Sequence, residues 1–304
     1  MRGSDEGLKS EPLRAALALA VTGKSQKLED LLIRHGGGSD PRPNLRLAAA
    51  LGVEIAALPD APHRLLSRFG GEDAAPDDPR VFLPMAAAHA WVALLRAERE
   101  QERAWAALAE LAADERAPVR LATRDALAGL TLREGGGRAL VTAAADWLAA
   151  DDLNKRFSST ALVVEVLNER RLITSLTAAA PQLLDYLARA VNEVAEAPRS
   201  AERLDGRRRL LLSLPPTLAT VVATLTAGDV GPAWFEDICA SAKDPEVRRV
   251  LSDTLLNLRK TSLGHSSTVA QRLRQVLGSS AKPLRDPTRL RPGTGRGKAS
   301  RRLR

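Results

Sequence analysis

The sequence predicts an all-α protein, an α-solenoid in which antiparallel helical hairpins stack side by side. One helical pattern recurs three times at nearly regular intervals, and its apolar residues follow a helical period. Hydrophobic residues make up 44% of the chain but aromatic residues only 3%, so alanine and leucine, both strong helix formers, dominate the core. No segment sustains the two-residue alternation of a half-buried strand, and no sheet is expected.

The three copies of the pattern occupy residues 44–52, 117–127 and 244–251. Each places a leucine or valine and an arginine just inside a helix start, followed by apolar residues three, four and seven positions further on. One helix alone cannot bury so wide a stripe. Recurrence of the stripe therefore predicts stacked hairpins.

The spacing of the copies supports a repeat. Leu45 and Val119 are 74 residues apart, which is two steps of 37, and Val247 follows Val119 by 128 residues, or three steps of about 43. Two further starts fill the gaps, at residues 78–81, which open an apolar run to Leu95, and at residues 155–164.

A sixth helix start, at residues 207–212, does not fall on a regular step. It follows the polar stretch 196–206, which contains Pro198 and Gly206 and predicts an inserted loop. We therefore expect residues 1–280 to form the solenoid, with one loop inserted near residues 196–206.

This pattern resembles the HEAT-repeat family, in which pairs of antiparallel helices of about forty residues stack into a curved superhelix. Asp114, six residues before Arg120, matches the aspartate and arginine that form a ladder along such stacks. Asp244 to Arg248 is similar to the usual start of the second helix, with Ala242 at the ladder aspartate position. The resemblance covers roughly residues 40 to 260 and implies fold far more than function.

The last 24 residues, 281–304, carry all the net charge of the chain. This tail has one acid, Asp286, and nine basic residues: Lys282, Arg285, Arg289, Arg291, Arg296, Lys298, Arg301, Arg302 and Arg304. It therefore accounts for the full net charge of +8. Proline and glycine are frequent in it and long apolar residues few, so we expect a disordered basic tail.

Such a tail attracts polyanions such as nucleic-acid phosphates, acidic lipid headgroups or an acidic protein surface. It contains no aromatic residue for base stacking, so any contact with nucleic acid is expected to ignore sequence. A tail that only improves solubility is an equal alternative.

Cysteine usage and hydropathy indicate a soluble cytoplasmic protein. Cys239 is the only cysteine, which excludes an intramolecular disulfide and fits a reducing compartment. The first residues lack the apolar run of a secretory signal. The uncharged run 210–228 contains Pro215, Pro216 and several threonines, and is expected to be a buried, kinked helix and not a membrane span.

The sequence offers no constellation for catalysis, metal binding or cofactor binding. Residues 22–25, Thr-Gly-Lys-Ser, lack the first glycine and the strand of a phosphate loop, and predict a turn. The four histidines have no chelating spacing. The pairs Asp77-Asp78 and Asp151-Asp152 are expected to cap helices. We therefore expect a protein that is not an enzyme, with no cofactor and no metal.

Tryptophans allow one sharper hypothesis. Trp105 and Trp234 stand 14 and 13 residues before Val119 and Val247, which predicts a shared packing role in first helices. DNA glycosylases built on HEAT-like repeats combine tryptophans with an aspartate on a concave face. The pair Asp146-Trp147 is the one comparable feature in this sequence, and no further residue of that family is matched.

Three functions follow, in order of preference. The first is a non-catalytic scaffold that binds another macromolecule, most plausibly a protein, along the solenoid surface, with the tail as an accessory electrostatic anchor. The alternative is a nucleic-acid-binding protein whose tail and second-helix arginines contact phosphates. A repeat-fold DNA glycosylase is third. A basic concave face would favour the second function, and an apolar or acidic face the first; the sequence leaves the partner and oligomeric state open.

Overall fold

The computed structural model describes residues 10–38, 40, 42–261 and 267–279 of the chain. Every regular element within these ranges is a helix, which confirms the prediction of an all-α fold. The basic tail, residues 281–304, lies outside the described residues together with all nine of its cations.

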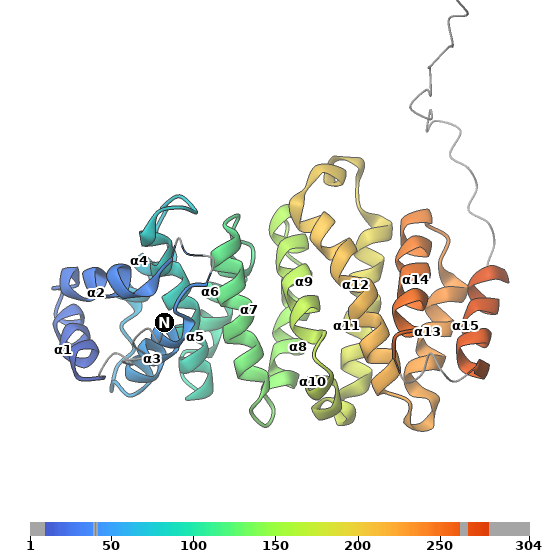
Figure 1. The fold of residues 1–304 in the computed structure, drawn as a ribbon, viewed down its shortest axis with the longest axis horizontal. Coiled ribbons are helices and arrows are strands. Elements are labelled where there is room, and N and C mark those ends of the chain that lie inside the picture. Colours follow the sequence, from blue (N-terminus) through green and yellow to red (C-terminus); the bar gives the residue numbers. More distant parts are fainter. Residues whose placement is uncertain (1–9, 39, 41, 262–266, 280–304) are drawn as a thin grey trace, which may run out of the picture.

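Six helices pack side by side in a row that follows the long axis of the molecule (Figure 1). We call this the central row; its members are α3 (Leu45–Ala56), α5 (Phe82–Arg96), α7 (Ala117–Thr131), α9 (Leu153–Leu167), α12 (Asp205–Thr224) and α14 (Pro245–Leu258). Each member contacts the next one in this order. The three copies of the sequence pattern begin α3, α7 and α14.

The remaining longer helices flank the central row. They are α1 (Ser10–Val21), α2 (Gln26–Gly36), α4 (His63–Gly70), α6 (Gln101–Ala112), α8 (Gly136–Trp147), α11 (Ala180–Glu196), α13 (Val230–Ser241) and α15 (Ser267–Ser279). The short elements are η1 (Pro79–Val81), α10 (Arg170–Ser175), η2 (Thr177–Ala179), η3 (Arg199–Arg203) and η4 (Ala227–Asp229). Flanking helices α4, α6, α8 and α11 each contact the central-row helix that follows them in sequence, whereas α13 contacts α12 and α15.

Side-chain caps mark the starts of α3, α9 and α14 and of the short helix η1 that leads into α5. The side chain of Asn44 accepts a hydrogen bond from the Leu47 amide at 3.1 Å, and that of Asp152 accepts from the Lys155 amide at 3.0 Å. Asp78 caps η1 and Asp244 caps α14 in the same way. The capping prediction is thus confirmed for one member of each aspartate pair. Residues 22–25 form a turn between α1 and α2, as predicted.

Helix α5 is the most enclosed member of the central row. It is buried on all sides except at Ala93 and Arg96, because α3, α4, α6 and α7 surround it. The backbones of α3 and α5 come so close that a Cβ atom at Gly52 would lie 2.8 Å from the carbonyl oxygen of His89. Only glycine fits at this contact.

Helix α12 contains the uncharged run and continues through Pro215 and Pro216. The hydroxyl of Thr217 donates a hydrogen bond across the row to the Val164 carbonyl in α9, at 2.9 Å. The hydroxyl of Thr220 contacts the amide oxygen of Asn168 at 2.8 Å. Polar side chains of this run therefore serve packing between helices. No helix in the described ranges is long and apolar enough to cross a membrane.

The stretch expected to be an inserted loop, residues 196–206, connects α11 to α12. It contains the short helix η3, whose Ala201 is fully buried against the core. This connection is therefore packed on the body of the protein.

Burial of His89 makes stability depend on pH. Desolvation lowers the pKa of His89 to about 4, against an ordinary value of 6.5. The unfolded chain therefore binds a proton that the folded chain does not, between these two values. We expect stability to fall by up to ~3 kcal/mol as the pH drops from 6.5 to 4. His89→Gln should flatten this part of the stability curve in urea unfolding at several pH values; an unchanged slope would contradict the assignment.

Core and surface positions of α7 provide a matched pair of variants. Val119 is fully buried, whereas Leu121 is 37% exposed on the same helix. Val119→Asp buries an unpaired charge and should cost about 3–5 kcal/mol. Leu121→Asp should stay within about 0.5 kcal/mol of the parent protein. Equal melting temperatures for the two variants would show that the inward face of α7 is misassigned.

Candidate binding groove

Three acidic turns lie along one edge of the central row. Asp77-Asp78, Asp114-Glu115 and Asp151-Asp152 stand at intervals of 37 residues, and each precedes a central-row helix or its leading turn. Because α5, α7 and α9 pack side by side, the turns before them come close together. The sequence indicated a capping role for two of these pairs, but not their alignment.

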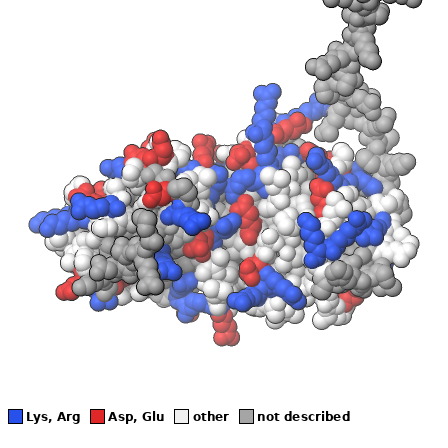
Figure 2. All heavy atoms as spheres, viewed as in Figure 1, with Lys and Arg blue, Asp and Glu red and all other residues white. Residues whose placement is uncertain are grey.

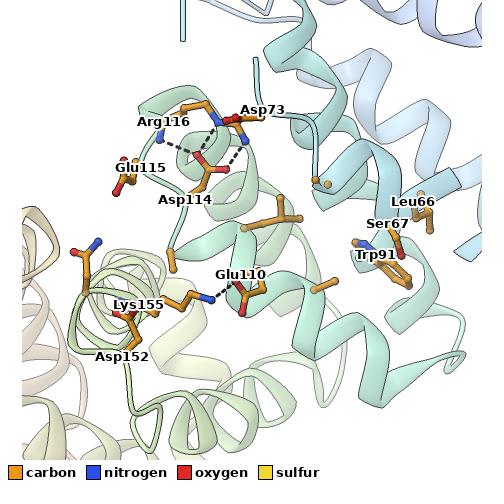
Figure 3. Close-up of a pocket in the computed structure, with 16 residues that line it drawn as sticks. Leu66, Ser67, Asp73, Trp91, Glu110, Asp114, Glu115, Arg116, Asp152 and Lys155 are labelled. Atoms are coloured by element: carbon orange, nitrogen blue, oxygen red, sulfur yellow. Dashed lines mark hydrogen bonds and ion pairs between the residues drawn. The ribbon is translucent and has the colours of Figure 1, made fainter. Parts of the chain in front are cut away.

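A groove of about 690 Å³ opens at this edge, between α4, α6 and the first residues of α9 (Figure 3). We call it the acidic groove. Its apolar lining includes Leu66, Trp91, Ala107 and Leu111. The charged residues that line it are five acids and two bases: Asp73, Glu110, Asp114, Glu115, Asp152, Arg116 and Lys155. The groove is therefore net negative.

Arg116 holds one side of the acidic groove together. Its guanidinium forms a bidentate pair with Asp114, with Nε–Oδ1 and Nη2–Oδ2 distances of 2.9 and 2.6 Å. Its Nη1 donates to the carbonyl oxygens of Glu72 at 2.6 Å and Ala74 at 3.1 Å. The loop before η1 is thereby attached to the turn before α7. The hydrogen bond to Asp114 is the main cause that raises the pKa of Arg116.

Lys155 closes the other side. Its Nζ lies 2.6 Å from Oε2 of Glu110, and this hydrogen bond raises the pKa of Lys155. Both side chains are about half exposed, so the pair contributes little to stability. Asp73 and Glu115 are exposed and make no ion pair within the described ranges. These two carboxylates remain available to a ligand.

The arginines of the predicted ladder, Arg120 and Arg248, contact backbone carbonyls of the turns that precede their helices. Arg120 donates to the backbone carbonyls of Asp114 and Glu115, at 2.7 and 2.5 Å, because Arg116 already occupies the Asp114 carboxylate. Arg248 likewise reaches the carbonyl of Ala242, six residues earlier, at 3.5 Å. The expected side-chain pairing of Asp114 with Arg120 thus takes the form of an arginine–backbone contact.

Arginines at the starts of central-row helices were the candidate phosphate track. Most of them bind carboxylates of neighbouring elements: Arg80 with Glu72, Arg156 with Glu193, Arg207 with Glu246, and Arg209 with Glu165. Burial and the nearby Arg209 lower the pKa of Arg120. Figure 2 shows acidic and basic side chains interspersed over much of the visible face, with basic ones gathered toward the α14 end.

A second cavity, of about 640 Å³, contains the residues of the glycosylase hypothesis. The rings of Trp105 and Trp147 meet edge to face with centroids 6.2 Å apart, and Asp146 and Arg138 line the same cavity. The sequence placed Trp105 and Trp147 on separate helices without indicating this contact. Trp147 is only 8% exposed, so most of its surface packs against the protein.

Neither cysteine nor histidine chemistry is evident in the described residues. No group of three histidine, cysteine, aspartate or glutamate side chains in these ranges is arranged to hold a metal ion. Burial raises the pKa of Cys239 to about 12, so its thiol stays protonated at neutral pH. Cys239 acts as the apolar packing residue that the sequence predicts.

The Arg116 contacts provide a test of the geometry of the groove. Arg116→Lys keeps the charge but loses the bidentate geometry and the contacts with the two carbonyls, which should cost about 1–3 kcal/mol. Amide hydrogen exchange should accelerate in residues 72–78. Arg124→Lys, at an exposed position on α7, serves as the control and should leave exchange unchanged. If residues 72–78 are equally protected from exchange in both variants, Arg116 does not hold this loop in place.

No protein-family model, curated protein or solved structure matches this chain. The function is therefore inferred from the residues and contacts of the chain itself.

Proposed function

We propose that this chain is a HEAT-like α-solenoid that acts as a non-catalytic scaffold and binds a protein partner at the acidic groove. The basic tail then serves as an accessory electrostatic anchor. The observation that carries this proposal is the groove itself, net negative at its rim and apolar in much of its lining. Such a surface fits a basic segment of a protein that also presents apolar side chains.

The sequence separation of long-range polar contacts supports the repeat. Contacts between side chains of adjacent hairpins join residues 36 to 45 positions apart in most cases. Examples are Arg14–Glu54, Arg103–His63, Lys155–Glu110, Arg209–Glu165 and Arg272–Glu236. A repeat of about forty residues produces this narrow range, because each unit contacts its neighbour at a constant offset.

Charge favours a protein partner over nucleic acid at the groove. Five carboxylates against two cations would repel phosphates. The helix-start arginines that could offset this repulsion are largely bound to Glu72, Glu165, Glu193 and Glu246. A phosphate would have to displace these carboxylates to use the arginines.

The two cations of the groove keep their charge at neutral pH. Hydrogen bonds to Asp114 and Glu110 move the pKa values of Arg116 and Lys155 upward, further from neutrality. Both groups therefore stay charged and suit a role in recognition.

Two alternatives keep a specific observation in their favour. Nucleic-acid binding is supported by the tail, which carries the whole net charge of +8. A DNA glycosylase is supported by the cavity that joins Trp105, Trp147 and Asp146. Release of a damaged base from DNA by the purified protein, and its loss in Asp146→Asn, would favour the glycosylase. A cytoplasmic location remains part of the leading proposal and is supported by the single cysteine.

If partners bind the acidic groove, reversing the charge of its unpaired carboxylates should release them. In affinity purification from nuclease-treated extract, Asp73→Lys with Glu115→Lys should lose its bound proteins at least tenfold. Asp185→Lys, at an exposed position on α11, is the matched control and should retain them. Equal retention by both variants would show that partners bind elsewhere. Asp73 attracts the Arg116 guanidinium without forming an ion pair, so circular dichroism of the double variant and its melting temperature must match the parent for partner loss to be assigned to the groove.

Deletion of residues 281–304 separates the tail from the helical body. The net charge falls from +8 to 0, while the melting temperature should stay nearly constant. If the tail binds polyanions, nonspecific DNA retention should disappear with it. For the full chain on duplex DNA, log affinity should fall with log salt at a slope of about −0.9 per phosphate neutralised. Retention that survives deletion with the same slope would assign the contact to the arginines of the body.

A further inference from the structure

The acidic groove has the features of a site for an extended basic peptide. Its floor is apolar, with half-buried Ala107 and the nearly buried side chains of Leu66, Trp91 and Leu111, and carboxylates stand at the rim. Asp73 and Glu115 extend from that rim into solvent without an ion pair in the described ranges. A ligand that carries cations separated by occasional long apolar residues would match both parts of this lining.

One segment of the chain has this composition. Residues 281–304 hold nine cations against one acid, and their long apolar residues are Leu284, Leu290 and Leu303. The preceding 280 residues carry no net charge. The segment is therefore the one large positive charge that the protein itself can offer to the groove.

The segment is long enough to reach the groove. The described chain ends at Ser279 in α15, which packs on α13 and α14 (Figure 1). Four helix-to-helix steps separate α15 from α7, through α14, α12 and α9. At about 8–10 Å per step this span is roughly 40 Å. The 24 residues beyond position 280 can extend to roughly 80 Å.

We infer that residues 281–304 bind the acidic groove of their own chain when no partner occupies it. The inference takes the groove of the proposed function as its site and names an intramolecular occupant. Because both are parts of one molecule, the effective concentration of the tail is in the millimolar range, and a weak interaction suffices. A polyanion that binds the tail would uncover the groove, and a basic protein partner would compete with the tail for it.

Zero-length cross-linking of the full-length protein tests this inference. A carbodiimide joins carboxylates to the amines of Lys282 and Lys298, and mass spectrometry identifies the products. At low salt we expect coupling to Asp73 and Glu115 at least tenfold above coupling to Asp237, an exposed carboxylate on α13. Helix α13 contacts α15, so an undirected tail would meet Asp237 first. Coupling at the groove should vanish in 0.5 M salt, because the Debye length there is shorter than at 0.05 M by a factor on the order of three.

A second variant separates the electrostatic attraction between tail and groove from the effect of their covalent connection. Arg289→Gln, Arg291→Gln and Arg296→Gln together leave both lysines and every groove carboxylate in place. Groove coupling should then fall to the level at Asp237. Coupling that is even over the surface, or unchanged in this variant, would overturn the inference.

An equal mixture of ¹⁴N- and ¹⁵N-labelled protein identifies which chain supplies the tail. Products that join light to light and heavy to heavy support binding within one chain, whereas mixed products would overturn it in favour of a second copy. Partner loss in Asp73→Lys with Glu115→Lys but no groove cross-links would refute tail binding and leave the scaffold function standing. Groove cross-links without partner loss would refute the scaffold function at this groove and leave tail binding standing.

Discussion

Side-by-side packing in the central row is the constraint on which the rest of the structure depends. One close point of that packing is the contact between Gly52 and the His89 backbone, where no side chain fits. Helix α5 is enclosed by its neighbours except at Ala93 and Arg96. Because α7 and α9 pack side by side, the turns before them lie close together, and Asp114 and Asp152 line one groove. The acidic groove is a result of this packing.

Polar contacts between neighbouring elements reinforce this packing, and in many of them an arginine is paired with a carboxylate. Arg116 attaches one hairpin to the loop of the preceding one, and Arg209 and Arg207 reach across to Glu165 and Glu246. Arginine suits this role because its planar group can bind a carboxylate and backbone carbonyls together. The same contacts remove these cations from the surface available to a ligand. Cohesion between hairpins and a basic binding face thus compete for the same side chains.

Local chemistry let the sequence predict where the helices of the central row begin, to within a few residues. Asn44, Asp78, Asp152 and Asp244 all act as caps, and the apolar stripes that begin at Val119 and Val247 are buried. In the first copy Leu45 is only half-buried and Ala49 is exposed, and the buried stripe instead includes Leu47, Ala48 and Leu51. Each of these features depends on residues within about two turns of one another, which is the range that helical periodicity reports. The coil expected at residues 196–206 instead contains η3, because burial of Ala201 is a tertiary effect.

The candidate site was much less accessible from sequence. Lys155 and Glu110 are 45 residues apart, and nothing in either neighbourhood indicates that they meet. Asp114 could pair with Arg116 or Arg120, and the choice depends on the Glu72 and Ala74 carbonyls that position Arg116 from another hairpin. Sequence reports which residues are charged, whereas the packing of α4, α6 and α9 decides which of them share a groove.

The cross-row hydrogen bond from Thr217 to the Val164 carbonyl has a consequence for cooperativity. It lies beside two successive prolines, where α12 has lost backbone donors of its own. Helix α12 therefore depends on α9 for a hydrogen bond to the buried hydroxyl of Thr217, in addition to apolar contact. When one of the two helices opens, the other loses a partner for a buried polar group, at a cost of order 1–3 kcal/mol. The middle of the protein should therefore melt as one block, while the outermost helices at either end unzip first.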